Sequence, residues 1–401
     1  MVIQLIRISN YYYIFIDSHQ MERLRAFLLM ILAKELKCMI NKQKLYLLAF
    51  VSAAMVLLLM NITGAAPFAY ITNQGSNSIS VIDTTTNKIT ATIDGAVEGP
   101  GIAATQDGKK VYVANINNDT VSVIDTATNK ITTTVPLGNE TTQLVPYAIA
   151  VSPDGKKVYV ANNGGGCVTR GGWTVSVIDT ATNKVTDTIE VGAEPYGIAV
   201  SPDGKKIYVA CYDNDGVDVI DTANNTITAA VDVGSFPKGV AVNPSGTKVY
   251  ITNSHADQST GTVSVIDTAT NKVTANVLVG ESPYGVVVTP DGTKVYVVNT
   301  GFYPNYKSTV SVINTKTNKI IATIPVGKEP NGVAVTPDGT KVYVVNSGGI
   351  YDMPSSVSVI NTATNKVANN ITVGSNPIAI GQFIGGNIQN DEVSGSNLGF
   401  H

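Results

Sequence analysis

The chain has 401 residues, of which 14% are charged, and its formal net charge is −3. Residues 1–66 hold 7 Lys/Arg and 3 Asp/Glu, so 20 basic and 27 acidic residues follow from residue 67 onward, with Arg170 as the one arginine there. Nucleic-acid binding normally uses a basic stripe with arginine side chains, so the composition argues against that class of function.

The N-terminal segment has the layout of an export signal. Lys42 and Lys44 precede an uncharged apolar run, residues 45–60, and small residues follow it. A basic, an apolar and a small-residue region in this order are typical of a signal peptide, which we expect over residues 39–66. A retained membrane anchor is the alternative, although the run is somewhat short for a span. Residues 1–38 are then a candidate for a mis-called N-terminal extension.

From residue 67 onward, one unit recurs seven times. The isoleucine of its Val-Ile-Asp/Asn-Thr motif stands at Ile82, Ile124, Ile178, Ile220, Ile266, Ile313 and Ile360. Repeats of roughly 40–50 residues with four short strands each are typical of β-propeller blades.

The third unit illustrates the four strands expected in a blade. Residues 146–152 and 157–162 flank a Pro-Asp-Gly turn, and residues 174–179 and 185–191 flank a Thr/Asn-rich turn. The first strand is apolar on nearly every residue and contains Gly or Ala at alternate positions, which suits an innermost strand covered on both faces. The last strand alternates Thr with Val or Ile, so one of its faces can meet water.

The two ends of the repeat complement each other. Residues 68–73 form a second-strand motif with no first strand before it, and residues 376–383 form a first-strand motif with no second strand after it. Pairing these segments would leave no open edge. We therefore predict an all-β fold over residues 67–386: a seven-bladed β-propeller of four-stranded antiparallel blades, with the ring closed by the C-terminal strand pairing into the N-terminal blade. Residues 387–401 would form a short polar tail.

The second strand of each unit begins with a tyrosine and reads Tyr-Val/Ile-Thr/Ala/Val-Asn, except that Cys211 replaces the Asn once. These strands, with the Ser-Pro-Asp-Gly-Lys and Ala-Thr-Asn-Lys turns, resemble the YVTN β-propeller repeats of archaeal and bacterial surface-layer proteins. The resemblance covers essentially the whole chain after the signal. It implies an extracytoplasmic propeller, secreted or exposed at the surface of an archaeal cell.

Residues that break the repetition are the candidates for binding, because residues repeated in every blade are most simply structural. Length variation falls on the face that carries the loop after the second strand, and variable loops on a rigid scaffold often bind partners. The aromatic candidates in these loops are Trp173, Phe302, Tyr303, Tyr306 and Tyr351.

A second group of candidates surrounds the expected opening of the central channel on the same face. It consists of Glu98, Glu194, Glu281, Glu329, Tyr147, Tyr196, Tyr284 and Lys238. A polar rim that binds a cationic or carbohydrate ligand is one interpretation. The other is a solvated loop in which Glu precedes Pro for reasons of turn geometry.

Three further sites are weaker hypotheses. Cys167 and Cys211 fall on one face of neighbouring blades, so a disulfide and two unrelated thiols are both open. The carboxylates of Asp213, Asp215 and Asp218 are spaced as in some calcium loops but lack a closing Glu, which leaves an ordinary turn as the alternative. N-glycosylation sequons begin at Asn118, Asn139, Asn224 and Asn370.

Enzyme motifs are missing from the repeat. After the signal the chain has two histidines, His255 and His401, and no Cys-x-x-Cys-His, Gly-x-Ser-x-Gly or phosphate-loop motif. Seven-bladed lactonases are similar in fold, but Arg170 and His255 lie in loops of different blades.

The sequence therefore predicts a non-catalytic cell-surface propeller, a structural or binding scaffold that acts through its variable-loop face. We expect no cofactor and no metal. We expect a cell-envelope protein or glycan as partner, no nucleic acid, and membrane contact only through an uncleaved N-terminal segment. The alternative is a ligand-binding or lactonase-like propeller that uses the channel mouth.

Overall fold

The computed structural model describes residues 67–95, 99–138, 143–165, 172–254, 260–302, 307–349 and 355–385, with the backbone of residues 5–8 and 11–14. The chain divides into two compact units, residues 1–63 and 64–401. The described part of the first unit is a hairpin of β1 (Leu5–Ile8) and β2 (Tyr11–Ile14). Among the described residues, no helix has the length and apolarity needed to span a bilayer.

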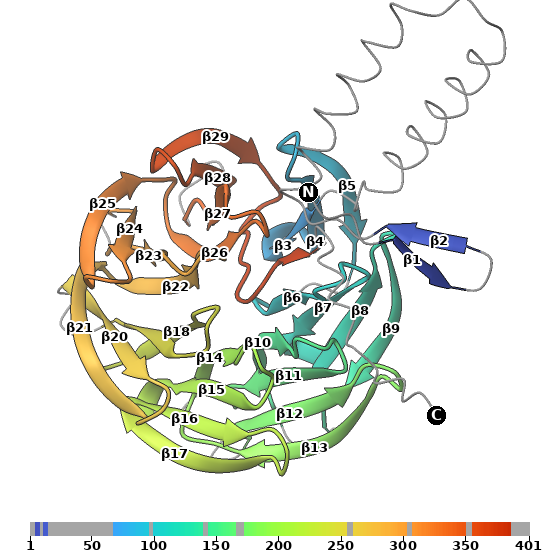
Figure 1. The fold of residues 1–401 in the computed structure, drawn as a ribbon, viewed down its shortest axis with the longest axis horizontal. Helices are drawn as coiled ribbons and strands as arrows, with labels where there is room; N and C mark the ends of the chain where they lie inside the picture. The colour runs from blue at the N-terminus through green and yellow to red at the C-terminus, as the bar shows by residue number, and fades with distance from the viewer. Residues whose placement is uncertain are drawn as a thin grey trace, which may run out of the picture. The chain divides into compact units, whose positions relative to one another are not determined.

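The second unit contains a ring of seven antiparallel sheets, each of four strands (Figure 1). Numbered in chain order and written from the innermost strand outward, blade 1 is β30 (Ile384–Gly385), β3 (Phe68–Asn73), β4 (Ser78–Asp83) and β5 (Lys88–Asp94). Blade 2 is β6 (Ile102–Ala104), β7 (Lys110–Asn115), β8 (Thr120–Asp125) and β9 (Lys130–Pro136). Blade 3 is β10 (Pro146–Val151), β11 (Lys157–Asn162), β12 (Thr174–Asp179) and β13 (Lys184–Glu190).

The remaining blades follow the same order. Blade 4 is β14 (Pro195–Val200), β15 (Lys206–Cys211), β16 (Gly216–Asp221) and β17 (Thr226–Asp232). Blade 5 is β18 (Pro237–Val242), β19 (Lys248–Asn253), β20 (Thr260–Asp267) and β21 (Lys272–Glu281). Blade 6 is β22 (Pro283–Val288), β23 (Lys294–Asn299), β24 (Thr309–Asn314) and β25 (Lys319–Pro325). Blade 7 is β26 (Pro330–Val335), β27 (Lys341–Asn346), β28 (Ser356–Asn361) and β29 (Lys366–Thr372). Single 3-10 turns occur at η1 (Gln74–Ser76), η2 (Ile116–Asn118) and η3 (Tyr212–Asn214).

The core lies between neighbouring blades. The tyrosine of every second strand is at most 2% exposed, and Tyr112 of blade 2 packs in one cluster with Val158 and Val160 of blade 3. Polar groups add to these contacts. Lys248 Nζ donates to the carbonyl oxygen of Thr315 in the next blade (3.2 Å), and Tyr296 Oη donates to Asn365 Oδ1 (2.8 Å). The repeated Tyr and Lys side chains therefore hold adjacent blades together.

The asparagine at the end of each second strand connects it to the third strand. In blade 6, Asn299 Nδ2 donates to Thr309 Oγ1 (3.0 Å) and Ser311 Oγ (2.9 Å), and Asn299 Oδ1 accepts from Gly280 N (3.0 Å). Blade 4 lacks this asparagine, and there Cys211 Sγ contacts Asp218 Oδ2 (3.5 Å).

The C-terminal segment closes the ring. Ile384 and Gly385 pair with Ala69 and Phe68 of β3, and Tyr70 N donates to Phe383 O (2.9 Å). The same segment reaches the next blade, where Ile102 N donates to Ile380 O (3.0 Å). This arrangement confirms the predicted seven-bladed fold and its closure into the N-terminal blade.

Candidate functional site

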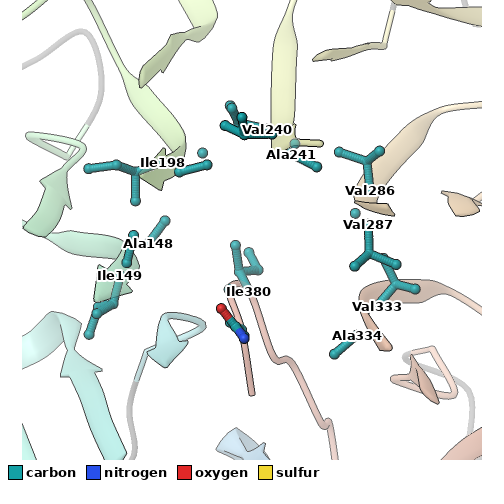
Figure 2. Close-up of a pocket in the computed structure, with 18 of the residues that line it drawn as sticks. Ala148, Ile149, Ile198, Val240, Ala241, Val286, Val287, Val333, Ala334 and Ile380 are labelled. Atoms are coloured by element: carbon teal, nitrogen blue, oxygen red, sulfur yellow. The ribbon is translucent and has the colours of Figure 1, made fainter. Parts of the chain in front are cut away.

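A cavity of about 540 Å³ is lined by the inner strands around the ring axis. Figure 2 shows aliphatic side chains of several blades around it, including Ile149, Ile198, Val240, Val286 and Val333. Small residues let the inner strands approach one another closely. A Cβ atom added at Gly197 would collide with the carbonyl oxygen of Lys238 in the next blade. The wall of the cavity is therefore mostly hydrocarbon and backbone.

Five inner strands contain an irregularity at the same place. In β10, β14, β18, β22 and β26 the pairing with the second strand shifts directly after the first proline. A β-bulge of this kind leaves a residue out of the ladder and changes the direction of its side chain. The residues at these positions, which we call the bulge residues, are Tyr147, Tyr196, Lys238, Tyr284 and Asn331.

Aromatic rings form a continuous row next to the cavity. The ring centroids of Tyr147 and Tyr196 are 4.5 Å apart, those of Tyr196 and Tyr212 are 4.8 Å apart, and those of Tyr212 and Phe236 are 4.7 Å apart. The hydroxyls of Tyr147 and Tyr284 form a hydrogen bond with each other. Burial raises the pKa of both groups, so these hydroxyls stay protonated at neutral pH.

Lys238 carries the positive charge of this region. Its Nζ lies 5.0 Å from the ring centroid of Tyr284 and 5.7 Å from that of Tyr212, within range of cation–π attraction. Among the described residues, no carboxylate lies within 4.0 Å of this nitrogen. Burial lowers the pKa of Lys238 to about 8. The ammonium is thus held beside aromatic faces with no described counter-ion.

The side-chain amide of Asn331 uses its nitrogen but not its oxygen in hydrogen bonds. Its Nδ2 donates to the carbonyl oxygen of Pro377 (3.0 Å), whereas its buried Oδ1 has no partner. The residue is 9% exposed and lines the cavity together with Lys238, Tyr196 and Tyr284. Lys238 and Asn331 therefore offer a free cationic donor and a free acceptor at one cavity.

The described candidate glutamates, Glu194, Glu281 and Glu329, are not among the residues that line this cavity. Glu194 and Glu329 take φ values of 51° and 49°, and the residue before the inner-strand proline is left-handed in four other blades too: Val145, Phe236, Ser282 and Asn376. The backbone carbonyl of Glu194 accepts from Tyr212 N (3.0 Å), and that of Glu329 accepts from Ser347 N (3.2 Å). Glu194 and Glu329 therefore share a backbone role, as the left-handed residue of the turn before the inner strand. Glu281 forms an ion pair with Lys307 (3.4 Å).

The loop candidates are described only in part. Trp173 and Phe302 are half-buried, and Trp173 Nε1 is buried without a hydrogen-bond partner. Glu98, Tyr303, Tyr306 and Tyr351 lie outside the described residues, so their roles stay predictions.

The carboxylates of the proposed calcium loop bind separate groups. Asp215 Oδ1 accepts from Phe236 N (2.9 Å), Asp218 Oδ2 accepts from Gly192 N (2.8 Å), and Asp213 is exposed. Across the described ranges, no three His, Cys, Asp or Glu side chains gather in a way that could hold a metal ion.

Cys211 is a free, buried thiol, and its burial raises its pKa. Its proposed disulfide partner, Cys167, lies outside the described residues. The structure therefore does not show this disulfide.

Three of the four sequon asparagines are described. Asn118, Asn224 and Asn370 are exposed, and Asn370 Oδ1 accepts from Ser358 Oγ (2.8 Å). Asn139 lies outside the described residues.

Sequence reasoning selected Tyr147, Tyr196, Lys238 and Tyr284, which the structure brings together. It missed Asn331, Tyr212 and Phe236. Asn331 follows the inner-strand proline just as Lys238 and Tyr284 do, so alignment of the repeats could have found it. Phe236 precedes the inner-strand proline, at the position of Glu194 and Glu329, so the same alignment could have found it. Tyr212 lies in the 3-10 turn η3 and carries no such signal.

Comparison with known proteins relates the chain to one protein family and to solved structures of similar fold. A family model described as "Cytochrome D1 heme domain" matches residues 68–377. A hydrazine synthase structure from Kuenenia stuttgartiensis is 23% identical with a TM-score of 0.62, and covers 70% of this chain and 88% of its own. A functionally unknown protein from Desulfotomaculum acetoxidans DSM 771 is 18% identical with a TM-score of 0.63, and covers 79% and 99%. No curated protein matches the chain.

Proposed function

The chain belongs to the Cytochrome D1 heme domain family, and from that premise we propose that it is a non-catalytic binding propeller that acts outside the cytoplasm. The observation that carries this proposal is the channel wall, which is built mostly from aliphatic side chains and backbone. The repeated polar residues bind neighbouring blades, as Lys248 does with Thr315. The bulge residues and the variable loops thus remain for recognition.

The channel residues do not fit the haem that the family name implies. Haem iron in proteins is held by His, Cys, Met or Tyr. Among the described residues that line the cavity there is no His, Cys or Met, which leaves Tyr196 and Tyr284. Tyr284 Oη is bonded to Tyr147, and burial raises its pKa well above its usual value, which disfavours the phenolate that would bind iron. We therefore assign no haem chemistry to this chain.

The partner we propose is a cell-envelope protein or glycan bound at the variable-loop face. Trp173 and Phe302 supply aromatic surface in two of these loops, and aromatic side chains are enriched in binding interfaces. The signal-like segment at residues 39–66 and the surface-layer resemblance support a place at the cell surface. Attachment to a surface layer, as a structural or binding component, is the finer form of this proposal.

Two measurements on the purified full-length chain test the proposal. Titration with haem, followed by absorption spectroscopy, should give no saturable band, and a band that saturates at one haem per chain would overturn the non-haem assignment. Cosedimentation with a cell-envelope fraction should detect binding that Trp173→Ala or Phe302→Ala weakens. Leu278→Ala is the matched control, because this apolar side chain is 60% exposed on the outermost strand of blade 5. Equal loss in this control would contradict loop-mediated binding.

A second candidate function, ligand binding at the channel mouth, is favoured by one observation. Lys238 and Asn331 line the cavity with a cationic donor and an acceptor that have no described partners. Several repeated asparagines, such as Asn73 and Asn346, also have a buried side-chain oxygen without a partner. The feature that distinguishes the mouth is therefore the Lys238 ammonium, which has no described counter-ion.

A further inference from the structure

The bulge residues differ in chemistry although they occupy equivalent positions. Aligned on the inner-strand proline, blades 3 to 7 present Tyr147, Tyr196, Lys238, Tyr284 and Asn331, while the next residue is Gly or Ala in each strand. The corresponding positions in blades 2 and 1 are Pro100 and Ile378. The polar side chains thus occupy consecutive blades and form one arc of the ring, with an apolar sector completing it.

The arc contains two unmet hydrogen-bonding capacities of opposite kind. Lys238 Nζ has three donors, and the contacts that it makes with described residues are with the faces of Tyr212 and Tyr284. Asn331 Oδ1 is a buried acceptor without a partner. Leaving such groups unpaired is costly, and the cost is recovered when a ligand supplies the partners. A ligand that satisfies both must bring an anionic group and a hydrogen-bond donor.

The other residues that line the cavity indicate the net charge of that ligand and the polarity of the rest of the molecule. Among the described residues that line it, Lys238 is the single cationic side chain. This suits a monoanion better than a phosphate, whose higher charge is usually met by several donors. Beyond the bulge residues the wall is formed mainly by aliphatic side chains such as Ile198, Val240 and Val286, with Gln106, Ser152 and Gln382 as further polar lining residues. A volume of about 540 Å³ is in the range of small-molecule sites, which are mostly apolar with few polar groups.

We propose that the channel mouth binds a small organic carboxylate with an apolar body and a nearby hydroxyl. The carboxylate pairs with Lys238 Nζ, the hydroxyl donates to Asn331 Oδ1, and the apolar body fills the channel. The row of aromatic rings encloses the carboxylate and the hydroxyl of the ligand, with protonated hydroxyls at Tyr147 and Tyr284. This inference rests on the proposed binding function and names the ligand class of the same site.

Calorimetric titration of the full-length chain at pH 6.5 tests the ligand class with three probes. They are 3-hydroxyoctanoate, its methyl ester, which lacks the charge, and octanoate, which lacks the hydroxyl. The hydroxy acid should bind most tightly, and removal of the charge should weaken binding by about 10- to 100-fold, the range for a charged hydrogen bond. Equal binding of acid and ester, or no binding of the acid, would overturn the proposal.

Two variants assign the contacts. Lys238→Met keeps the apolar stem and should reduce affinity for 3-hydroxyoctanoate by about 10- to 100-fold. Asn331→Ala should remove the preference for 3-hydroxyoctanoate over octanoate. Lys272→Met, an exposed lysine on β21, removes the same charge far from the inner strands and should leave binding unchanged. Thermal unfolding of each variant verifies that it is folded.

The outcomes separate this inference from the function on which it rests. Wild-type affinity in Lys238→Met, or an equal loss in Lys272→Met, would refute the proposed site. In that case the haem titration and the envelope cosedimentation still report on the binding propeller by themselves. A saturable haem band together with selective carboxylate binding would refute the non-haem assignment alone.

Discussion

The turns of the propeller and its channel mouth differ in whether their charged side chains have partners. In the turns, Ser152 Oγ donates to Asp154 Oδ1 (2.6 Å), and Thr182 Oγ1 donates to Asp179 Oδ1 (2.7 Å). At the mouth, Lys238 has no described counter-ion and Asn331 Oδ1 has no partner. The recurring turn carboxylates are thus paired locally, whereas the Lys238 ammonium, which occurs in one blade, has no described counter-ion.

The acid–base properties of the two regions follow from this difference. Hydrogen bonds lower the pKa of Asp154, chiefly the bond from Ser152, so its charged form is favoured. Burial lowers the pKa of Lys238 and raises that of Tyr284, so their charged forms are disfavoured. The turns stabilise the charges they carry, and the mouth holds a charge at a cost that a ligand could offset.

Removing the closing segment should have the largest effect. Truncation before Asn376 deletes β30 and the side chain of Phe383, which is 0% exposed. We expect a loss of more than the roughly 3–5 kcal/mol typical for a buried Phe replaced by Ala. Hydrogen exchange should show faster exchange in β3–β5 than in β26–β29. Faster exchange in the last blade instead would contradict closure through the first.

Removing a satisfied asparagine should come next. Asn299→Ala deletes two donated bonds and the acceptor of Gly280 N, so we expect a loss of about 2–4 kcal/mol in the free energy of unfolding. Asn331→Ala deletes one bond, to Pro377 O, and should cost about 1 kcal/mol. Urea unfolding of both variants measures the difference. Equal costs would contradict the expectation that the loss of stability follows the number of hydrogen bonds removed.

Lys238→Met should increase stability at neutral pH. The folded pKa of about 8 lies below the ordinary value of 10.5, so between these values the unfolded chain binds more protons and wild-type stability rises with pH. The variant lacks this rise. It should be more stable by about 1–3 kcal/mol at pH 7, with the gap closing toward pH 10.5.

The other titratable groups around Lys238 should not mask this effect. Tyr147, Tyr196, Tyr212 and Tyr284 have raised pKa values and stay neutral at pH 7, and the pKa of Glu194 is also raised. Urea unfolding at several pH values provides the test. A variant less stable than wild type at pH 7 would show that the ammonium is already paired.

The smallest effect should come from a single turn carboxylate. Asp154→Ala removes bonds from Ser152 Oγ and Lys156 N, and should cost about 0.5–1.5 kcal/mol at pH 7. Because the folded pKa of Asp154 is lowered, its contribution is present above the unfolded value of 3.8 and is lost as the pH falls below it. The exposed ion pair with Lys156 (3.8 Å) should add little. If the stability difference between wild type and Asp154→Ala persisted at pH 2, the hydrogen bonds of the ionised carboxylate could not be its cause.

The sequence was sufficient for the fold because its signals are local and repeated. Turn residues, strand periodicity and the two incomplete end motifs determine the blade number and the closure through residues 376–383. The same comparison of repeats brought Tyr147, Tyr196, Lys238 and Tyr284 together.

The sequence was insufficient where chemistry depends on pairing between strands. A bulge exists only relative to the partner strand, so the sequence alone did not single out Asn331 after Pro330. Glu194 and Glu329 looked like a charged rim, yet their common feature is a left-handed backbone that Val145 also adopts. Which atom of a residue is used, backbone or side chain, follows from contacts that the sequence does not contain.

The bulges allow the side chains at the channel mouth to change independently of the strands that form the blades. A residue left out of the ladder can be exchanged without altering the strand pairing, whereas its neighbour Gly197 is fixed by the carbonyl oxygen of Lys238. Gene duplication of a blade therefore supplies a new variable position together with an unchanged frame. A propeller of this kind can therefore change the side chains at its channel mouth through five codons while its strand pairing stays the same.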